Sequence, residues 1–189
     1  MKYILKTNLK NIASVQTGVF LKPQSEGEVL YMQVKHFDNN FALLPSIHAD
    51  LKEQSVNQKH LLNPGDILFA AKGSNNFAAV YQKNYPKAVA STSFFVIKLT
   101  GENILPDYLA WFINYPKTME LLKNFARGTS ITSISKSVLE ELEISVPEMQ
   151  VQQSILKINE LRMRQKTLVS KIEDLREQLI QQQIFKALK

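Results

Sequence analysis

The 189-residue sequence contains no cysteine, which excludes disulfides, zinc–thiolate sites and thiol-based catalysis. The first ten residues contain no apolar run after their charged positions, so no secretory signal is visible. No stretch reaches the roughly eighteen consecutive apolar residues that a membrane-spanning helix requires. We therefore expect a soluble, intracellular protein of the cytoplasm.

The common motifs of enzymes are missing as well. There is no Gly-x-x-x-x-Gly-Lys phosphate loop, no Gly-x-Gly-x-x-Gly dinucleotide turn and no Gly-x-Ser-x-Gly nucleophile elbow. Pro106-Asp107 resembles the start of a nuclease motif, but no Glu-x-Lys follows it. His36, His48 and His60 lie twelve residues apart without the pairing of a helical metal site. We predict a binding protein with no catalytic residues, no metal site and no cofactor of its own.

The composition is that of a folded protein with a basic balance. Hydrophobic residues make up 44% and aromatic residues 9% of the chain, enough to build a core. Twenty-three Lys and Arg against seventeen Asp and Glu give a net charge of +6. A charge of this size is compatible with a polyanionic partner but is also common in proteins that have none.

The C-terminal segment, residues 147–189, carries a heptad pattern without Gly or Pro after its first residue. Its seam has steps of three and four residues and consists of Ile158, Leu161, Gln165, Leu168, Ile172, Leu175 and Leu179. Pro147 stands where a helix is expected to begin. Such a helix would be roughly 60 Å long, so we expect its seam to pair with a helix of another copy or chain. The alternative is a terminal helix folded back on its own domain.

The preceding residues, 1–146, indicate a mixed α/β domain, so the expected fold class is α+β with a long C-terminal helix. Pro64-Gly65 fits the centre of a type II turn in which Gly supplies a positive φ. Residues 9–15 are expected to form a short helix or turn that enters a β region. Apolar runs predict strands at 28–34, 67–70, 77–81, 88–90 and 93–99, and helical spacing predicts helices at 107–114 and 116–125. Leu139, Leu142, Ile144 and Val146 are expected to pack before the helix begins.

Side chains that bond phosphates and base edges are concentrated in the loops between these elements. The candidate DNA-binding residues are Lys22, Gln33, Lys35, Asn39, Lys72, Ser74, Asn75, Asn76, Arg127, Thr129, Ser130 and Lys136. A single polar loop is usually only exposed to solvent and binds nothing, so the hypothesis of DNA binding depends on all of these loops together. A rival interpretation treats residues 107–125 as a helix-turn-helix with Pro116 in its turn. Its second helix offers only Lys117, Lys123 and Asn124, and we prefer a packing role for it.

The order of motifs resembles the DNA-specificity subunit of type I restriction–modification systems. The matching segments are 9–13 with Gly18, 63–68 with Gly73, 104–109, 128–130, and 142–147 leading to Gln152 and Ile155. The resemblance covers nearly the whole chain. It corresponds to half of the usual subunit, with one target-recognition domain (1–146) and one spacer helix (147–189).

The resemblance implies a non-catalytic reader of double-stranded DNA that recognises one half of a split target. S-adenosylmethionine, ATP and Mg would act only in the modification (methyltransferase) and restriction subunits with which it assembles. Spacer helices of this family pair antiparallel, so the missing helix would come from a second copy in a homodimeric coiled coil. Two alternatives remain: a coiled-coil adaptor that binds protein rather than DNA, and an enzyme whose active site follows no familiar motif.

Overall fold

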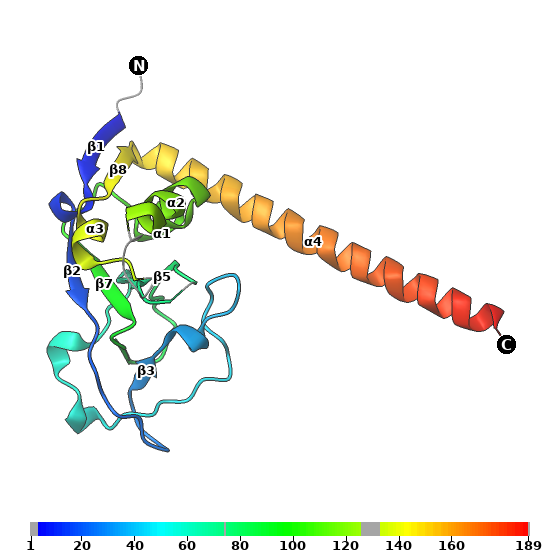
Figure 1. Ribbon diagram of the computed structural model, residues 1–189, viewed down its shortest axis with the longest axis horizontal. Coiled ribbons are helices and arrows are strands. Elements are labelled where there is room, and N and C mark those ends of the chain that lie inside the picture. The colour runs from blue at the N-terminus through cyan, green and yellow to red at the C-terminus, as the bar shows by residue number, and fades with distance from the viewer. Residues whose placement is uncertain (1–3, 74, 126–132, 189) are drawn as a thin grey trace. The chain divides into compact units, whose positions relative to one another are not determined.

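The computed structural model describes residues 4–73, 75–125 and 133–188 (Figure 1). The chain divides into two compact units, Met1–Gln152 and Gln153–Lys189. The first unit is mixed α/β, and the second consists of the greater part of one long helix. Within the described residues no helix combines the length and the apolar character needed to cross a membrane.

The first unit is built around a four-stranded antiparallel sheet. Its strands, in spatial order, are β2 (Ala13–Thr17), β7 (Phe94–Leu99), β4 (Ile67–Ala70) and β5 (Ala78–Val80). Every residue of β4 is buried, which explains why its sequence is a continuous apolar run and not an alternating one. The main core contains the fully buried rings of Phe77 and Phe94 together with residues of β4 and β6.

Two further strand pairs complete the unit. β1 (Ile4–Asn8) pairs antiparallel with β8 (Glu143–Pro147), and β3 (Leu30–Met32) pairs parallel with β6 (Ala88–Ala90). The helices are α1 (Pro106–Asn114), α2 (Pro116–Phe125), α3 (Lys136–Glu140) and α4 (Met149–Ala187). Short 3-10 turns occur at η1 (Leu9–Asn11), η2 (Val34–His36), η3 (Glu53–Ser55) and η4 (Gln58–His60).

The turn before β4 has the predicted type II character. Gly65 has a φ of 93°, and the Asp66 N–H donates to the Asn63 carbonyl at 2.9 Å, which closes the four-residue turn. The buried carboxylate of Asp66 accepts from the Asn63 N–H at 2.9 Å and pairs with Lys98 of β7 at 3.0 Å. The Pro-Gly-Asp sequence therefore sets the turn and ties it to the neighbouring strand.

Several predicted boundaries need correction. The helix expected to begin at Pro147 begins at Met149, because Pro147 is the last residue of β8 and pairs with Ile4. The strand expected over 28–34 is reduced to Leu30–Met32, because Gln33 caps the 3-10 turn η2. The prediction for residues 9–15 is confirmed, with η1 leading into β2, and Leu139, Leu142, Ile144 and Val146 are buried as expected.

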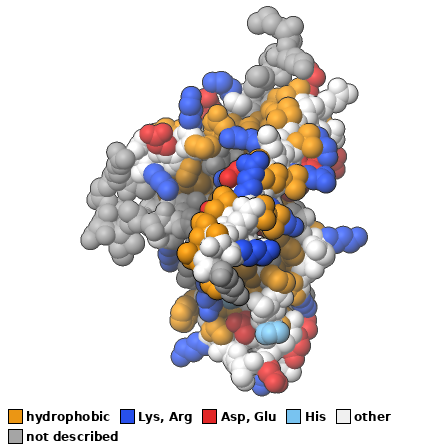
Figure 2. Space-filling model, turned by 90° about the vertical axis from the view of Figure 1, so that its right-hand side faces the viewer, with side chains coloured by type: hydrophobic (Ala, Val, Ile, Leu, Met, Phe, Trp, Pro, Cys, Tyr) orange, Lys and Arg blue, Asp and Glu red, His pale blue; other side chains and the backbone are white. Residues whose placement is uncertain are grey.

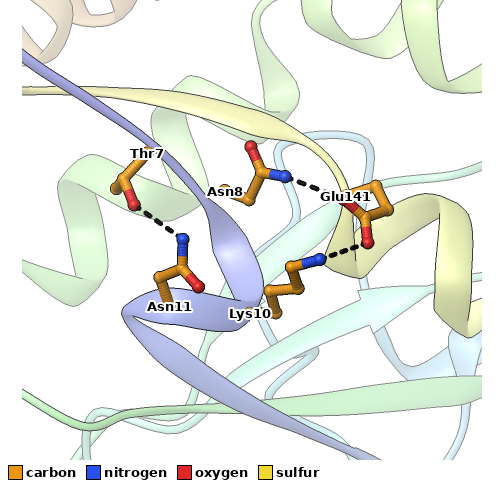
Figure 3. A network of polar contacts seen from close by, with 5 residues as sticks. All are labelled: Thr7, Asn8, Lys10, Asn11 and Glu141. Atoms are coloured by element: carbon orange, nitrogen blue, oxygen red, sulfur yellow. Dashed lines mark hydrogen bonds and ion pairs between the residues drawn. The ribbon is translucent and has the colours of Figure 1, made fainter.

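A polar network holds the β1–η1 corner to the turn between α3 and β8 (Figure 3). Glu141 accepts from Asn8 Nδ2 at 2.8 Å and pairs with Lys10 Nζ at 2.5 Å, while Asn11 Nδ2 donates to Thr7 Oγ1 at 3.2 Å. The hydrogen bond from Lys10 lowers the pKa of the Glu141 carboxyl. These contacts give a structural role to the Leu-Lys-Asn motif near the N-terminus.

The first turn of α4 is fixed by Gln152, a fully buried side chain. Its Nε2 donates to the carbonyls of Asn103 at 2.9 Å and Pro147 at 2.8 Å, and its Oε1 accepts from the Leu105 N–H at 2.9 Å. The side-chain amide thus provides hydrogen-bond partners for backbone groups of Asn103 and Leu105, just before α1, and of Pro147, just before α4. This explains why a glutamine stands five residues after Pro147.

The second unit leaves the heptad seam exposed. The apolar seam side chains are between 48% (Ile172) and 66% (Ile158) exposed, and Gln165 is exposed too. The polar residues of the helix interact with one another, as in the pairs Lys157–Glu160 at 2.9 Å and Glu173–Arg176 at 3.2 Å. A single helix cannot cover its own seam, so these side chains are available to a partner.

Candidate nucleic-acid interface

A cleft of about 380 Å³ opens in the first unit where two loops meet α2. Its lining comes from the loop at 38–42, the loop between β4 and β5, the end of α1, and α2. The lining residues are Phe41, Asn76, Asn114, Pro116, Met119, Glu120, Lys123 and Asn124. Three amides, one lysine and one glutamate stand among apolar side chains, so the cleft offers hydrogen-bonding groups for the edges of a ligand but no net charge.

The loop between β4 and β5 is anchored at its base and polar at its tip. Asn76 Nδ2 donates to the Ala70 carbonyl at 3.0 Å, and the Ile134 N–H donates to the Ala71 carbonyl at 3.0 Å. Gly73 has a φ of 90° with open space around it, so the backbone conformation, and not crowding, calls for glycine here. Lys72 and Asn75 are exposed on this anchored loop.

The loop at 38–42 is held beside it by an aromatic stack. Phe41 lies on Phe77 with ring centroids 4.9 Å apart and planes 5° from parallel. Phe41 has a φ of 64°, and the Asp38 carboxylate supports the turn by accepting from the N–H groups of Asn40 at 2.8 Å and Ala42 at 2.9 Å. This stack brings Phe41 to the lining that Asn76 also forms, and Asn39 is exposed two residues before Phe41.

Asn114 connects α1 to the same part of the sheet. Its Nδ2 donates to the Ala78 carbonyl at 2.7 Å, and its Oδ1 accepts from the Ala78 N–H at 2.8 Å. The side-chain amide thereby bonds β5 as a neighbouring strand would. Neither Asn114 nor Phe41 is among the residues that the sequence predicts for the interface. The only local sign of the Phe41 turn is the run Asp38-Asn39-Asn40, which favours side-chain-supported turns.

The remaining predicted residues are distributed more widely. Gln33 caps η2, where its N–H donates to His36 Nδ1 at 3.3 Å, and Lys35 is exposed in the same turn. Lys136 begins α3 and pairs with Glu140 at 3.5 Å. Lys22 follows Leu21, which packs on the separate cluster around Tyr31 and Leu51, so the cleft does not include it. Ser74, Arg127, Thr129 and Ser130 lie outside the described residues.

The ionisation of His36 is affected by its surroundings. Burial lowers the pKa of its imidazole, the nearby Lys35 lowers it further, and Asp50 opposes the change. The neutral ring is the form whose Nδ1 can accept from the Gln33 N–H. The turn that presents Gln33 and Lys35 therefore depends on a neutral histidine.

The helices α1 and α2 are joined by the single residue Tyr115, which is shorter than the three or four residues of a typical helix-turn-helix connection. Thr118 and Leu122 of α2 are buried, while Lys123 and Asn124 face the cleft. The basic side chains visible in Figure 2 are interspersed with acidic and neutral ones. The cleft itself is lined by one basic residue, Lys123, and one acidic residue, Glu120, so it is not a concentrated basic patch.

Comparison with known proteins places these features in a family. The family model for the type I restriction modification DNA specificity domain matches residues 6–189. The type I restriction enzyme MjaVIII specificity subunit of Methanocaldococcus jannaschii is 25% identical over 150 residues, covering 79% of this chain and 32% of that protein. The chain therefore spans about a third of the length of this relative.

Solved structures share the fold. The S subunit of a type I restriction-modification system from M. genitalium aligns with a TM-score of 0.61 at 18% identity, covering 93% of this chain and 43% of that one. The HsdS subunit from Thermoanaerobacter tengcongensis aligns with a TM-score of 0.62 at 12% identity, covering 86% and 38%. The mixed α/β unit with a long C-terminal helix is thus the fold of these subunits, and the family predicted from the sequence motifs is confirmed. The chain belongs to the type I restriction modification DNA specificity domain family.

Proposed function

We propose that this chain is a non-catalytic DNA reader that recognises one half of a split target for a type I restriction–modification system. The observation that carries the proposal is the family match over residues 6–189, which includes the whole of the candidate interface. Methyl transfer from S-adenosylmethionine and ATP- and Mg-dependent cleavage would belong to the modification and restriction subunits with which it assembles.

The reading surface would comprise the loops at 38–42 and 72–76 and the polar side of α2. Asn75 is exposed and is the best candidate to contact a base, since an asparagine amide can bond adenine N6 and N7 together. Asn76 already donates to the Ala70 carbonyl, so we assign it to supporting the loop. Lys72 and Lys123 would bond phosphates and fix the register on the duplex. Residues 1–146 would form the recognition domain.

The C-terminal segment, residues 147–189, which contains the long helix α4, would bring in a second recognition domain by pairing with another copy. The exposed seam from Ile158 to Leu179 supports an intermolecular antiparallel coiled coil, in which Gln165 is a polar position that limits the register. A two-fold dimer presents the same reading surface twice. Its DNA target would therefore be an inverted repeat interrupted by bases that neither copy contacts.

The test is a selection of binding sites from random duplex DNA by the purified full chain, followed by sequencing. An interrupted inverted repeat among the selected sequences is the expected outcome. Failure to retain any DNA at low salt would favour the alternative of a coiled-coil adaptor that binds protein, which the exposed seam would also serve. An asymmetric selected site would contradict the homodimer and point to pairing with a different specificity chain.

A further inference from the structure

Glu120 is the acidic side chain in the lining of the cleft, and among the described residues it has no hydrogen-bond or ion-pair partner. It is exposed on α2, with Lys117 and Lys123 each three positions away. At that spacing Lys157 pairs with Glu160 at 2.9 Å on α4, so an ion pair at Glu120 would be unexceptional. Since the described part of the chain contains no such pair, the carboxylate is available to a ligand.

One face of α2 forms a wall of the cleft, and Glu120 stands in the middle of that face. The residues that this helix contributes to the lining are Pro116, Met119, Glu120, Lys123 and Asn124. Their spacing of three and four positions places them on one side of the helix, while Thr118 and Leu122 are buried on the other side. A ligand that contacts this wall therefore meets the carboxylate of Glu120.

Two amides of the cleft differ from Glu120 because the backbone already holds them. Asn76 Nδ2 donates to the Ala70 carbonyl at 3.0 Å. Asn114 donates to the Ala78 carbonyl at 2.7 Å and accepts from the Ala78 N–H at 2.8 Å. The sheet thus fixes the orientation of both amides, and the Glu120 carboxylate is an acceptor of the cleft that a ligand can use in full.

A carboxylate is a selective group on a DNA-contacting surface, because it only accepts hydrogen bonds. Phosphates repel it, and so do the other acceptors of the major groove: guanine O6 and N7, thymine O4 and adenine N7. Cytosine presents only the N4 amino donor there, from which a Glu or Asp side chain can accept. The apolar Phe41 and Met119 in the same lining make an unpaired carboxylate more costly once DNA excludes water from the cleft.

Resting on the proposed recognition of DNA, we infer that Glu120 accepts a hydrogen bond from the N4 amino group of a cytosine in the major groove. Glu120 is thus a specificity-determining residue that selects a C·G base pair in each half of the target. Lys123, almost one turn further along α2, is left to bond a phosphate. Any other base at this position would leave the carboxylate unpaired or beside an acceptor, so Glu120 excludes three bases as well as selecting one.

The test is the selection of binding sites from random duplex DNA by the full chain and by three variants: Glu120→Gln, Glu120→Ala and the matched control Glu102→Gln. The control makes the same change of charge at an exposed residue that is not part of the cleft lining. We expect Glu120→Gln to select adenine in place of one cytosine of each half-site, because a glutamine amide bonds adenine N6 and N7 together. Glu120→Ala should lose at least about tenfold of the discrimination at that position alone, and the control should select the wild-type site.

A second measurement places N4-methylcytosine at that position of the selected duplex, where the methyl group takes the place of the hydrogen that faces the major groove. The affinity of the wild type should fall at least about tenfold, whereas the affinity of Glu120→Ala should not change, because it makes no bond to N4.

If the wild type selects a defined site and both Glu120 variants select the same bases with the same discrimination, the assignment of Glu120 is wrong while the chain remains a DNA reader. The assignment is equally wrong if the base whose selection changes is not a cytosine. Failure of the wild type to retain any DNA at low salt would contradict the proposed function itself, and the assignment with it.

Discussion

Gln152 offers the sharpest test of how the start of the long helix is held in the first unit. Replacing it by leucine nearly preserves the volume of the side chain but removes both hydrogen-bonding ends of the amide. The Leu105 N–H and the carbonyls of Asn103 and Pro147 then lose the bonds that the amide makes to them. Because the site is fully buried, water cannot replace these bonds without opening the structure.

The expected loss of stability follows from the three backbone groups that lose their hydrogen-bond partner. A buried polar group without a partner costs about 1–3 kcal/mol, and the amide's own desolvation cost is recovered on substitution. We therefore expect Gln152→Leu to lower the free energy of unfolding by about 3–4 kcal/mol, a large share of the roughly 5–15 kcal/mol of a typical domain. The matched control is Gln153→Leu, the same change at the next, exposed position, which should stay within about 0.5 kcal/mol of the wild type.

The variant Gln152→Glu adds a pH dependence with a defined sign. Its carboxyl would face the carbonyls of Asn103 and Pro147, which favour a protonated acid, so the folded-state pKa would be raised. The protonated carboxyl stabilises the fold fully below about pH 4.3, the pKa of a glutamate in the unfolded chain. This contribution is lost as the pH rises through the higher pKa of the folded chain. Relative to the wild type, the variant should therefore lose stability as the pH rises above about 4.3.

Urea unfolding followed by tryptophan fluorescence measures these effects in the appropriate unit. The chain has one tryptophan, Trp111, which lies in α1 of the first unit with its ring 5.6 Å from that of Tyr108. Its fluorescence therefore reports the unfolding of the first unit and not that of the long helix. A Gln152→Leu midpoint equal to that of Gln153→Leu would refute the view that the amide holds the helix start.

Four other outcomes follow from the seam, the cleft and the η2 turn. Ile172→Asp combined with Leu175→Asp should give monomers with an unchanged Trp111 transition, and a dimer in sedimentation would contradict this. Lys72→Ala should weaken DNA binding most at low salt, whereas Asn75→Ala should reduce the discrimination between bases by about 1–3 kcal/mol. If both variants keep the affinity and the sequence preference of the wild type, the DNA-contacting surface lies elsewhere on the chain. Because the folded pKa of His36 is lowered, stability should fall as the pH drops below about 6.5, and His36→Gln should reduce that slope; equal slopes would exclude this origin. Deleting residues 167–173, one heptad, should keep the half-site sequence while changing the spacing, and an unaltered spacing would contradict a rigid coiled coil.

Local patterns were sufficient for those parts of the fold that depend on neighbouring residues. The positive φ of Gly65 follows from Pro64-Gly65, and the long helix follows from the uninterrupted heptads. The start of that helix was predicted two residues too early, because a proline suits a strand end as well as a first helical turn. The pairing of Pro147 with Ile4 decides between the two, and it joins opposite ends of the recognition unit.

The residues of the candidate interface that the sequence does not predict, Asn114 and Phe41, make contacts far from their own position in the chain. Asn114 bonds Ala78 across 36 positions. The role of Gln152 outside the interface is equally long-range, since it bonds Leu105 across 47 positions. No period or turn signal encodes such contacts, since each depends on the packing of elements that are formed separately. Phe41 is similar: its turn is local, but its role follows from stacking on Phe77 of the main core.

The antiparallel pairing of β1 with β8 has a consequence for the exchange of recognition units between proteins. Asn8 and Glu143 are paired in register, so the chain enters and leaves the unit at adjacent points. The residues between Asn8 and Glu143 therefore form one continuous segment whose two ends lie side by side in the β1–β8 strand pair. A different sequence inserted between Asn8 and Glu143 would retain the strand pair, but it would also replace the Asn103 carbonyl and the Leu105 N–H that Gln152 bonds. Exchange of this segment between proteins would therefore keep the start of the long helix in place only if the new segment offered the same two backbone groups.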